Sequence, residues 1–280
     1  MTDVITRTET LVPEPARALG ALLGVPVPDL ERDGLPLLWH WIYLLDRPAQ
    51  ADLGPDGHPV RGTLPAPPGP GHRRMWAGGR VRTSGPLRCG LSATRRTSVL
   101  AVAEKQGRSG RLTFVTIGQE ISQDGAVVIG EEQDIVYRAD AAGSPAAASS
   151  AAPAAASPPA VPPGPGEWEI EVSPSLLFRF SALTYNAHRI HYDRDYTRHV
   201  EGYPGLLTHG PLQALAMAEA ARAAGRASGR SGDLSFDYRL VSPLFDFQGL
   251  VVSAAAGPDG ATVTAARDRH GRQTASGRLS

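Results

Sequence analysis

The chain has 280 residues, and its 28 basic and 28 acidic side chains give a formal net charge of zero. This balance argues against nucleic acid or an anionic membrane as the main partner, while the length predicts two domains or one duplicated domain. A single cysteine, Cys89, excludes an intramolecular disulfide, and the opening residues lack a signal-peptide pattern, so a soluble, cytoplasmic protein is expected.

The first half has the pattern of helices followed by an antiparallel sheet. A short helix is expected over Ala16–Leu23 after a frayed start, and another over Leu35–Leu45, which is apolar nearly all round and therefore typical of an enclosed helix. Proline and glycine predict a long loop over Asp52–Gly71. Four strands should follow, at Arg80–Ser84, Ser92–Glu104, Leu112–Ile121 and Val127–Tyr137.

A low-complexity run of Ala, Ser and Pro separates the two halves. From Asp140 to Gly166 the composition can bury little apolar surface, which predicts a linker. The expected organisation is a first domain at residues 1–139, a linker at 140–167 and a second domain at 168–280.

The second half carries the clearest helix of the chain. Pro211 at the first position and Gly225 just past the end bracket a helix over Pro211–Ala224, composed almost entirely of small apolar residues. The half opens at Trp168–Val172, and four strands are expected after the helix, at Leu234–Val241, Leu250–Ala256, Ala261–Asp268 and Gln273–Leu279.

The two halves repeat one order of elements: an apolar helix, a strand, a Pro-Leu pair and three more strands. Pro86-Leu87 and Pro243-Leu244 occupy matching places. This repetition predicts a duplication in which each antiparallel sheet wraps its own central helix and the two sheets join edge to edge. The expected fold class is α+β, with the architecture of a double hot dog.

Titratable and hydrogen-bonding side chains are concentrated in Phe180–Asp193. His188 and His191 lie three residues apart, and Asn186 lies five before His191, so these groups can converge on a substrate. Histidine suits proton transfer near neutral pH. Two other interpretations stay open, namely surface histidines with a capping Asp, or a metal site. Metal ligands would come from His188, His191, Asp193, His199 and His209, but no established metal-binding spacing is present.

Gly210 adds an independent feature at the start of the second-half helix. Free backbone N–H groups and the positive end of the helix dipole favour a developing negative charge there. Such a donor is the main ingredient of an oxyanion hole. A histidine base with an oxyanion donor suits proton abstraction beside a thioester carbonyl, followed by addition or elimination of water.

Phe180–Asp193 and Thr208–Leu212 resemble the hydratase motif of the MaoC-like, R-specific enoyl-thioester hydratases. The whole chain is still more similar to the double-hot-dog type 2 hydroxyacyl-thioester dehydratases, a family that includes mesaconyl-CoA and itaconyl-CoA hydratases. The similar segments are Pro36–Tyr43, Leu53–Pro59, Arg73–Arg80, Lys105–Gly110, Glu131–Arg138, Tyr185–Asp193, Glu201–Leu212 and Phe236–Phe245.

The resemblance implies a CoA or carrier-protein thioester as substrate, syn addition or loss of water, and neither a metal nor an organic cofactor. It places the catalytic histidine at His191. The wider family has Asp where this chain has Asn186, Asn at His188 and Pro at Arg189. An amide cannot replace a carboxylate base, so the expected catalytic set is His191, Asn186 and Gly210, with His188 as the alternative to Asn186.

Further residues of the motif region are expected to contact the substrate, and two arginines of the first half could reach CoA phosphates. The substrate-binding residues expected are Tyr185, Arg189, Tyr192, Tyr203, His209, Arg73 and Arg108. His40, His58 and His72 are scattered, so the first half is expected to have lost its chemistry and to build the acyl or CoA tunnel.

Two other functions stay open on the sequence alone. A hot-dog thioesterase would direct water at the carbonyl, and a non-catalytic acyl-thioester-binding protein would bind without turnover. The sequence leaves undecided the acyl group, the choice between CoA and carrier protein, the direction of the reaction and a homodimer.

Overall fold

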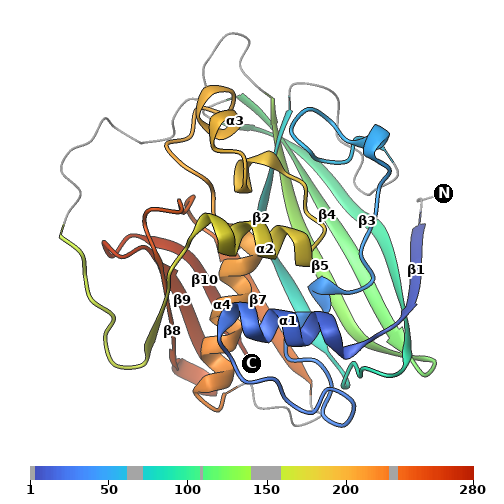
Figure 1. Cartoon of the computed structure of the whole chain (residues 1–280). Helices are drawn as coiled ribbons and strands as arrows, with labels where there is room; N and C mark the ends of the chain where they lie inside the picture. The colour runs from blue at the N-terminus through green and yellow to red at the C-terminus, as the bar shows by residue number, and fades with distance from the viewer. Residues whose placement is uncertain (1–3, 62–71, 108–109, 140–158, 227–232) are drawn as a thin grey trace.

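The structure, a computed structural model, describes residues 4–61, 72–107, 110–139, 159–226 and 233–280. Ten strands in these ranges form one antiparallel sheet, in the order β1-β3-β4-β5-β2-β7-β10-β9-β8-β6 (Figure 1). The first half contributes β1 (Val4–Thr10), β2 (His72–Thr83), β3 (Ser92–Gly107), β4 (Gly110–Gln123) and β5 (Ala126–Ala139). The second contributes β6 (Glu167–Ile170), β7 (Leu234–Leu240), β8 (Leu250–Ala256), β9 (Thr262–Arg267) and β10 (Gln273–Leu279).

The two five-stranded halves join through β2 and β7, whose pairing runs from Gly78 opposite Arg239 to Thr83 opposite Leu234. Glycine is required at this joint. A Cβ atom on Gly78 would lie 2.4 Å from the carbonyl oxygen of Tyr238 in β7. The predicted edge-to-edge association is therefore confirmed, and with it the double hot dog architecture.

Helix α4 (Gly210–Ala223) is the central helix of the second half and confirms the one predicted from the sequence. It packs against β8, β9 and β10 and also touches β2 across the joint. Every residue from Leu212 to Ala221 is buried, because small side chains let the helix lie close to the sheet. Helices α1 (Pro13–Leu23) and α2 (Pro174–Leu183) pack against each other in front of it (Figure 1).

The predicted helix over Leu35–Leu45 is wrong. Leu38 and Leu44 have positive φ angles of 69° and 53°, and only the short 3₁₀ helix η1 (Trp39–Ile42) forms between them. The polar atoms of the aromatic side chains explain the irregular path, because they bind partners in three different parts of the structure. Trp39 reaches Glu219 of α4, while His40 and Trp41 both bind Glu131 of β5 and Tyr43 reaches Val12.

Other elements also differ from the sequence prediction: β2 begins at His72, ahead of the predicted Arg80, and the helix at Arg194–His199 has no predicted counterpart. Val4–Thr10 is not frayed, since β1 pairs with β3 along its whole length. Helix α2 has no predicted counterpart, although Pro174 occupies its first turn and the Ser173 side chain caps it by accepting from Leu176 N. None of the helices among the described residues is long and apolar enough to cross a bilayer. Residues 140–158 of the expected linker lie outside the described ranges, and the domain division stays a prediction.

Trp39 is predicted to be a main determinant of stability, because its fully buried ring donates from Nε1 to the buried carboxylate of Glu219 at 2.8 Å. Trp39→Phe should lower the free energy of unfolding by about 2–4 kcal/mol, since it leaves a buried acceptor short of a donor and opens a cavity. Trp168→Phe, in a partly buried ring, serves as control. Urea unfolding of the variants measures the effect, and equal losses for both would contradict it.

Candidate active site

His191 lies in the 3₁₀ helix η3 (Arg189–His191), and one backbone contact sets its tautomer. Its Nδ1 is 2.8 Å from the carbonyl oxygen of Leu207. Because a carbonyl only accepts, Nδ1 carries the proton and Nε2 keeps a free lone pair. Burial lowers the pKa of His191 to about 4, so the ring is neutral at pH 7. This is the form that a general base requires.

Four histidine rings contact one another in a row, which we call the histidine row. The ring centroids are 3.9 Å apart for His58 and His188, 5.5 Å for His188 and His191, and 3.6 Å for His191 and His209. Burial, together with the neighbouring rings, holds the pKa of both His188 and His209 well below the usual histidine range. A charge on one ring therefore disfavours a charge on the next.

His209 supports His191 from the interior of the molecule. It is fully buried, and its ring is stacked on that of His191 with an interplanar angle of 19°. Its Nε2 lies 2.9 Å from Ser181 Oγ on α2, while Nδ1 has no partner among the described residues. The stacking and the Ser181 contact together fix the plane in which the His191 ring lies.

Gly210 follows His209 directly and begins α4. Its N–H has no acceptor among the described residues, and the side chain of His209 does not cap the helix. An added Cβ atom at Gly210 would lie 2.1 Å from Leu240 Cδ1, so the helix start fits closely against β7. A free donor at a helix N-terminus next to a neutral base is the combination needed to stabilise an enolate oxygen.

His58 reaches the site from the first half, on a loop that the sequence marks only as long and rich in proline. Residues 53–60, which we call the docking loop, lie on the motif segment. Arg189 donates from its backbone N to Asp56 O at 2.8 Å and from Nη1 to Pro55 O at 3.0 Å. Gly57 is essential to this approach, because a Cβ atom there would lie 1.9 Å from Ala187 O. The first half therefore brings His58 to the histidine row, although the sequence shows it only as one of three scattered histidines. The expected loss of chemistry in the first half stays a prediction.

Asn186 determines where His188 lies. Its Oδ1 accepts from the backbone N of His188 at 3.0 Å, and its own N donates to Ser181 O at 2.8 Å. Tyr185 just before it has a positive φ of 52°, which turns the chain sharply out of α2. The amide oxygen is thus engaged in the turn, and Nδ2 remains as the polar group that can face a water molecule.

The other predicted substrate-binding residues fall into three groups. Tyr185 and Tyr192 are exposed beside the motif, and Tyr203 lies near Phe245. Arg189 binds Asp193 at 2.8 Å besides holding the docking loop. Outside the described parts lie Arg108 and the side chain of Arg73. Their roles in binding stay predictions.

The burial of His188 and His191 decides between a surface position and a place in the site. His188 and His191 are 8% and 7% exposed, so they are not surface histidines. Asp193 is a capping residue, as the surface interpretation proposes, because it accepts from Tyr196 N at the start of α3 (Arg194–His199). His199 is exposed at the other end of that helix.

One group of side chains has the composition of a metal site. Asp56, His58 and His188 place potential ligand atoms within 4.8 Å of one another. Two observations favour a hydrogen-bonded group over an ion. The Asp56 carboxylate already accepts from His58 Nδ1 at 3.0 Å, and the positive charge of Arg74 helps to lower the pKa of both histidines, a field that opposes a cation.

The Leu207 carbonyl, which orients His191, lies in an extended segment that pairs with another segment later in the chain. Leu207 forms an isolated bridge with Phe245, and Thr208 N donates to Leu244 O at 2.8 Å. The position of the Leu207 oxygen therefore depends on residues 242–248, which lie about 40 residues further along the chain.

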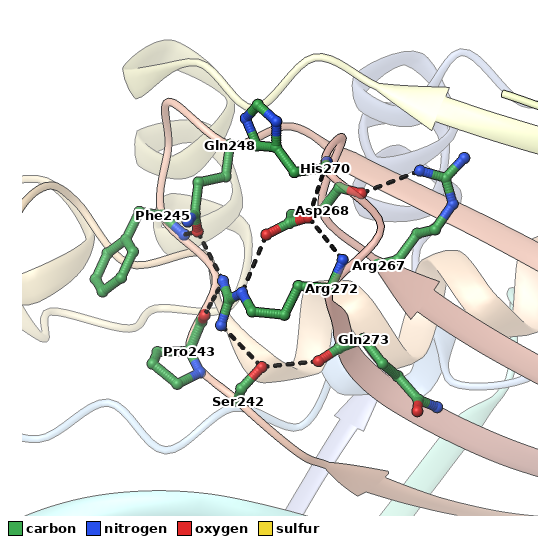
Figure 2. Close-up of polar contacts among 9 residues, drawn as sticks. All are labelled: Ser242, Pro243, Phe245, Gln248, Arg267, Asp268, His270, Arg272 and Gln273. Atoms are coloured by element: carbon green, nitrogen blue, oxygen red, sulfur yellow. Dashed lines mark hydrogen bonds and ion pairs between the residues drawn. The ribbon is translucent and has the colours of Figure 1, made fainter. Parts of the chain in front are cut away.

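Residues 242–248 are in turn fixed by the turn between β9 and β10 (Figure 2). Arg272 donates to Ser242 Oγ at 2.9 Å, to Pro243 O at 2.9 Å and to Gln248 Oε1 at 3.0 Å. The buried carboxylate of Asp268 accepts from Arg272 Nε at 3.0 Å and so holds the guanidinium in place. A charged pair outside the site thus supports the backbone that orients the base.

Comparison with known proteins gives a family for this arrangement. A model of the family described as hydroxyacyl-thioester dehydratase type 2 matches residues 38–246. The mesaconyl-C(4)-CoA hydratase of Chloroflexus aurantiacus is 45% identical over 253 residues, which are 87% of this chain and 85% of that protein. The chain belongs to the type 2 hydroxyacyl-thioester dehydratase family.

Solved structures agree with this assignment at the level of the fold. HtdX of Mycobacterium tuberculosis superposes with a TM-score of 0.65 at 15% identity, covering 99% of both chains. A MaoC-like dehydratase of Phytophthora capsici gives 0.64 at 13% identity, covering 99% of this chain and 94% of that one. As a type 2 dehydratase, the protein is a hydro-lyase that adds water to an acyl thioester or removes it.

The lowered pKa of His191 predicts a loss of stability in acid. Unfolded histidine binds a proton near pH 6.5 and folded His191 near pH 4, so the unfolded chain binds more protons in this window and stability falls as the pH drops through it. The penalty should reach about 3 kcal/mol for this group. The free energy of unfolding, measured with urea between pH 7 and pH 4, should fall less with pH in His191→Gln than in the wild type. An equal fall in both proteins would contradict the lowered pKa.

Proposed function

We propose that this dehydratase acts on the CoA thioester of a short, branched, unsaturated dicarboxylic acid, with a mesaconyl-type acyl group as the first candidate. The similarity to the mesaconyl-C(4)-CoA hydratase extends over 85% of that protein, so it includes both halves of the fold. A homodimer and a cytoplasmic location stay predictions beside this one.

The observation that carries the proposal is the pairing of a neutral His191, with Nε2 free, and an unpaired Gly210 N–H at the start of α4. In hydration, His191 Nε2 takes a proton from water while the water oxygen bonds to the β-carbon. The C=C electron pair then moves toward the thioester oxygen, where Gly210 N–H stabilises the charge. Protonation of the α-carbon completes the product, and dehydration is the reverse.

Asn186 and His188 remain the two candidates for aiming the water. Asn186 Nδ2 is available to donate to the water oxygen, since Oδ1 is bound to His188 N. The His188 ring lies 5.5 Å from that of His191, centroid to centroid, and could hold the same water. Comparing Asn186→Ala with His188→Ala distinguishes the two, because the crippled variant marks the residue that orients the water.

A positive charge beside the histidine row supports a dicarboxylic substrate. Arg74 of β2 contributes to the lowered pKa of both His58 and His188, so its charge lies within electrostatic reach of the site. The free carboxylate of a dicarboxylic acyl group would find its counter-charge there. A panel of monocarboxylic and dicarboxylic enoyl-CoA thioesters tests the class. Loss of enoyl absorbance reports hydration, and release of free thiol would instead report a thioesterase.

His191→Ala is expected to lower turnover of the best enoyl-CoA by about 10²–10⁴-fold, the usual loss for a general acid/base. His199→Ala, which changes an exposed histidine of the same region, is the matched control and should retain wild-type turnover. Thermal unfolding of both variants separates chemistry from folding. Unchanged turnover in His191→Ala would remove this residue from the mechanism.

Gly210→Ala keeps the N–H donor but drives a methyl group into Leu240, so the start of α4 must shift. Turnover should fall about tenfold or more, since misplacing one oxyanion donor costs a large part of its 10²–10³-fold contribution. The double variant Gly210→Ala/Leu240→Ala removes the clash and should recover most of that activity. Steady-state kinetics decide, and a double variant no better than the single one contradicts the geometry.

A further inference from the structure

Asp56 and His58 form a hydrogen-bonded pair at one end of the histidine row. His58 Nδ1 lies 3.0 Å from Asp56 Oδ2, and the backbone N of His58 donates to Asp56 Oδ1 at 3.0 Å. Because the carboxylate only accepts, Nδ1 carries the proton and Nε2 is the free acceptor. The two side chains are 28% and 16% exposed, so the pair is enclosed but open to a bound ligand.

His58 and His191 differ in what holds the Nδ1 proton. His191 donates from Nδ1 to a neutral carbonyl oxygen, that of Leu207, whereas His58 donates from Nδ1 to the ionised carboxylate of Asp56. Burial is the larger effect and, together with Arg74, leaves the pKa of His58 lowered, while Asp56 opposes it by stabilising the protonated ring. Burial would raise the pKa of Asp56, yet its hydrogen bonds from His58 outweigh burial and the net pKa is lowered. The carboxylate therefore favours a second proton on His58 more than the carbonyl favours one on His191.

The docking loop holds Asp56 and His58 in a fixed position within the site. Leu53 bridges to Pro59, and Gly54 N donates to His58 O at 2.7 Å, so the loop is closed on itself. Arg189 anchors it through two bonds to the backbone oxygens of Pro55 and Asp56. His58 is consequently fixed against His188, one ring away from His191.

Hydration of an enoyl thioester requires two proton transfers, one from the attacking water and one to the α-carbon. Asn186 lies in the turn before His188, but its amide can neither give nor take a proton at neutral pH. The described part of the site offers one carboxylate in contact with the histidine row, that of Asp56.

We propose that His58, held by Asp56, is a second catalytic acid/base residue, which exchanges a proton with the α-carbon while His191 exchanges one with the water. The inference rests on the proposed hydratase function. It assigns to the first half of the chain a direct part in the chemistry.

In the hydration direction, His58 first takes a second proton from solvent on Nε2, with Asp56 holding the Nδ1 proton. His58 then gives the Nε2 proton to the α-carbon, whose new C–H bond uses the C=C electron pair. Water bonds to the β-carbon through oxygen and gives a proton to His191 Nε2. The proton then returns from His191 to His58, directly across His188 or through solvent, and the site is reset. Dehydration runs these transfers in reverse.

The first test compares His58→Gln, Asp56→Asn and a matched control, Asp52→Asn. Asp52 lies just before the docking loop and pairs with Arg61, so its replacement removes the same charge without touching His58. On the enoyl-CoA that the wild type hydrates best, His58→Gln should lose about 10²–10⁴-fold in kcat. The kcat of Asp56→Asn should fall about tenfold or more, as it does when the carboxylate that orients a catalytic histidine is removed. The kcat of Asp52→Asn should not change.

The pH profile distinguishes proton transfer from a merely structural role. The groups facing His58 are Asp56 on its own loop, Arg74 of β2 and His188 of the motif. Removing the Asp56 charge destabilises protonated His58, so its pKa falls further. The alkaline limb of kcat/KM should therefore move to lower pH in Asp56→Asn and stay in place in Asp52→Asn.

The second test separates the two residues by isotope exchange. The 3-hydroxyacyl-CoA product is incubated with each variant in D₂O, and loss of the α-hydrogen signal is followed by proton NMR. His191→Ala should still exchange the α-hydrogen, because His58 makes and breaks that bond, and His58→Gln should not. The opposite pattern overturns the assignment of roles.

Other outcomes are equally decisive. If the wild type is active and the kcat of both His58→Gln and Asp56→Asn stays within twofold of the wild-type value, the inference is wrong but the proposed function stands. A wild type that hydrates no thioester of the panel overturns both the inference and the proposed function. Activity abolished by EDTA and restored by Zn²⁺ alone would make Asp56, His58 and His188 metal ligands and overturn the proton-transfer role.

Discussion

The pairing of β2 with β7 is the constraint on which the rest of the structure depends. It turns two half-sheets into one sheet and places both halves around one core, so that Trp39 of the first half binds Glu219 in the central helix of the second. Loops of the first half then have fixed positions relative to the motif of the second.

The electrostatics of the site follow from what each histidine ring is bonded to. Burial disfavours charge on every member of the histidine row, and neighbouring rings add to the effect at His188, His191 and His209. A backbone carbonyl fixes the His191 tautomer without stabilising its cation, whereas the Asp56 carboxylate does both for His58. One row of chemically identical side chains thus offers a proton two different electrostatic surroundings.

Buried polar groups outside the site serve to hold irregular backbone in place. Glu131 binds His40, Trp41 and Gln133, and Asp268 holds Arg272 against the segment beside Leu207. Such segments lack the repeated hydrogen bonds of a helix or strand, so side chains must satisfy their backbone and fix their path. Removing one partner would leave the other buried and unpaired, which makes these groups costly to change.

The sequence by itself determined the features that depend on local pattern. Pro211 and Gly225 mark the ends of α4, and alternating and β-branched segments mark most strands. The histidines concentrated in Phe180–Asp193 mark a candidate site, within which motif resemblance points to His191. Even the double hot dog follows from the repeated order of elements and from motif resemblance. These signals are local because helix caps, strand periodicity and motif spacing depend on residues close together in the chain.

Only the tertiary structure decided what depends on distant partners. The apolar segment at Leu35–Leu45 has the composition of a helix, but its aromatic polar atoms bind Glu131 and Glu219, far along the chain, and these contacts prevail over local propensity. Likewise, Pro55 lies 134 residues from the Arg189 that anchors its loop, so nothing in the sequence near His58 indicates that it joins the histidine row. Its place follows from the packing of the two halves into one core, a long-range interaction that local sequence does not encode.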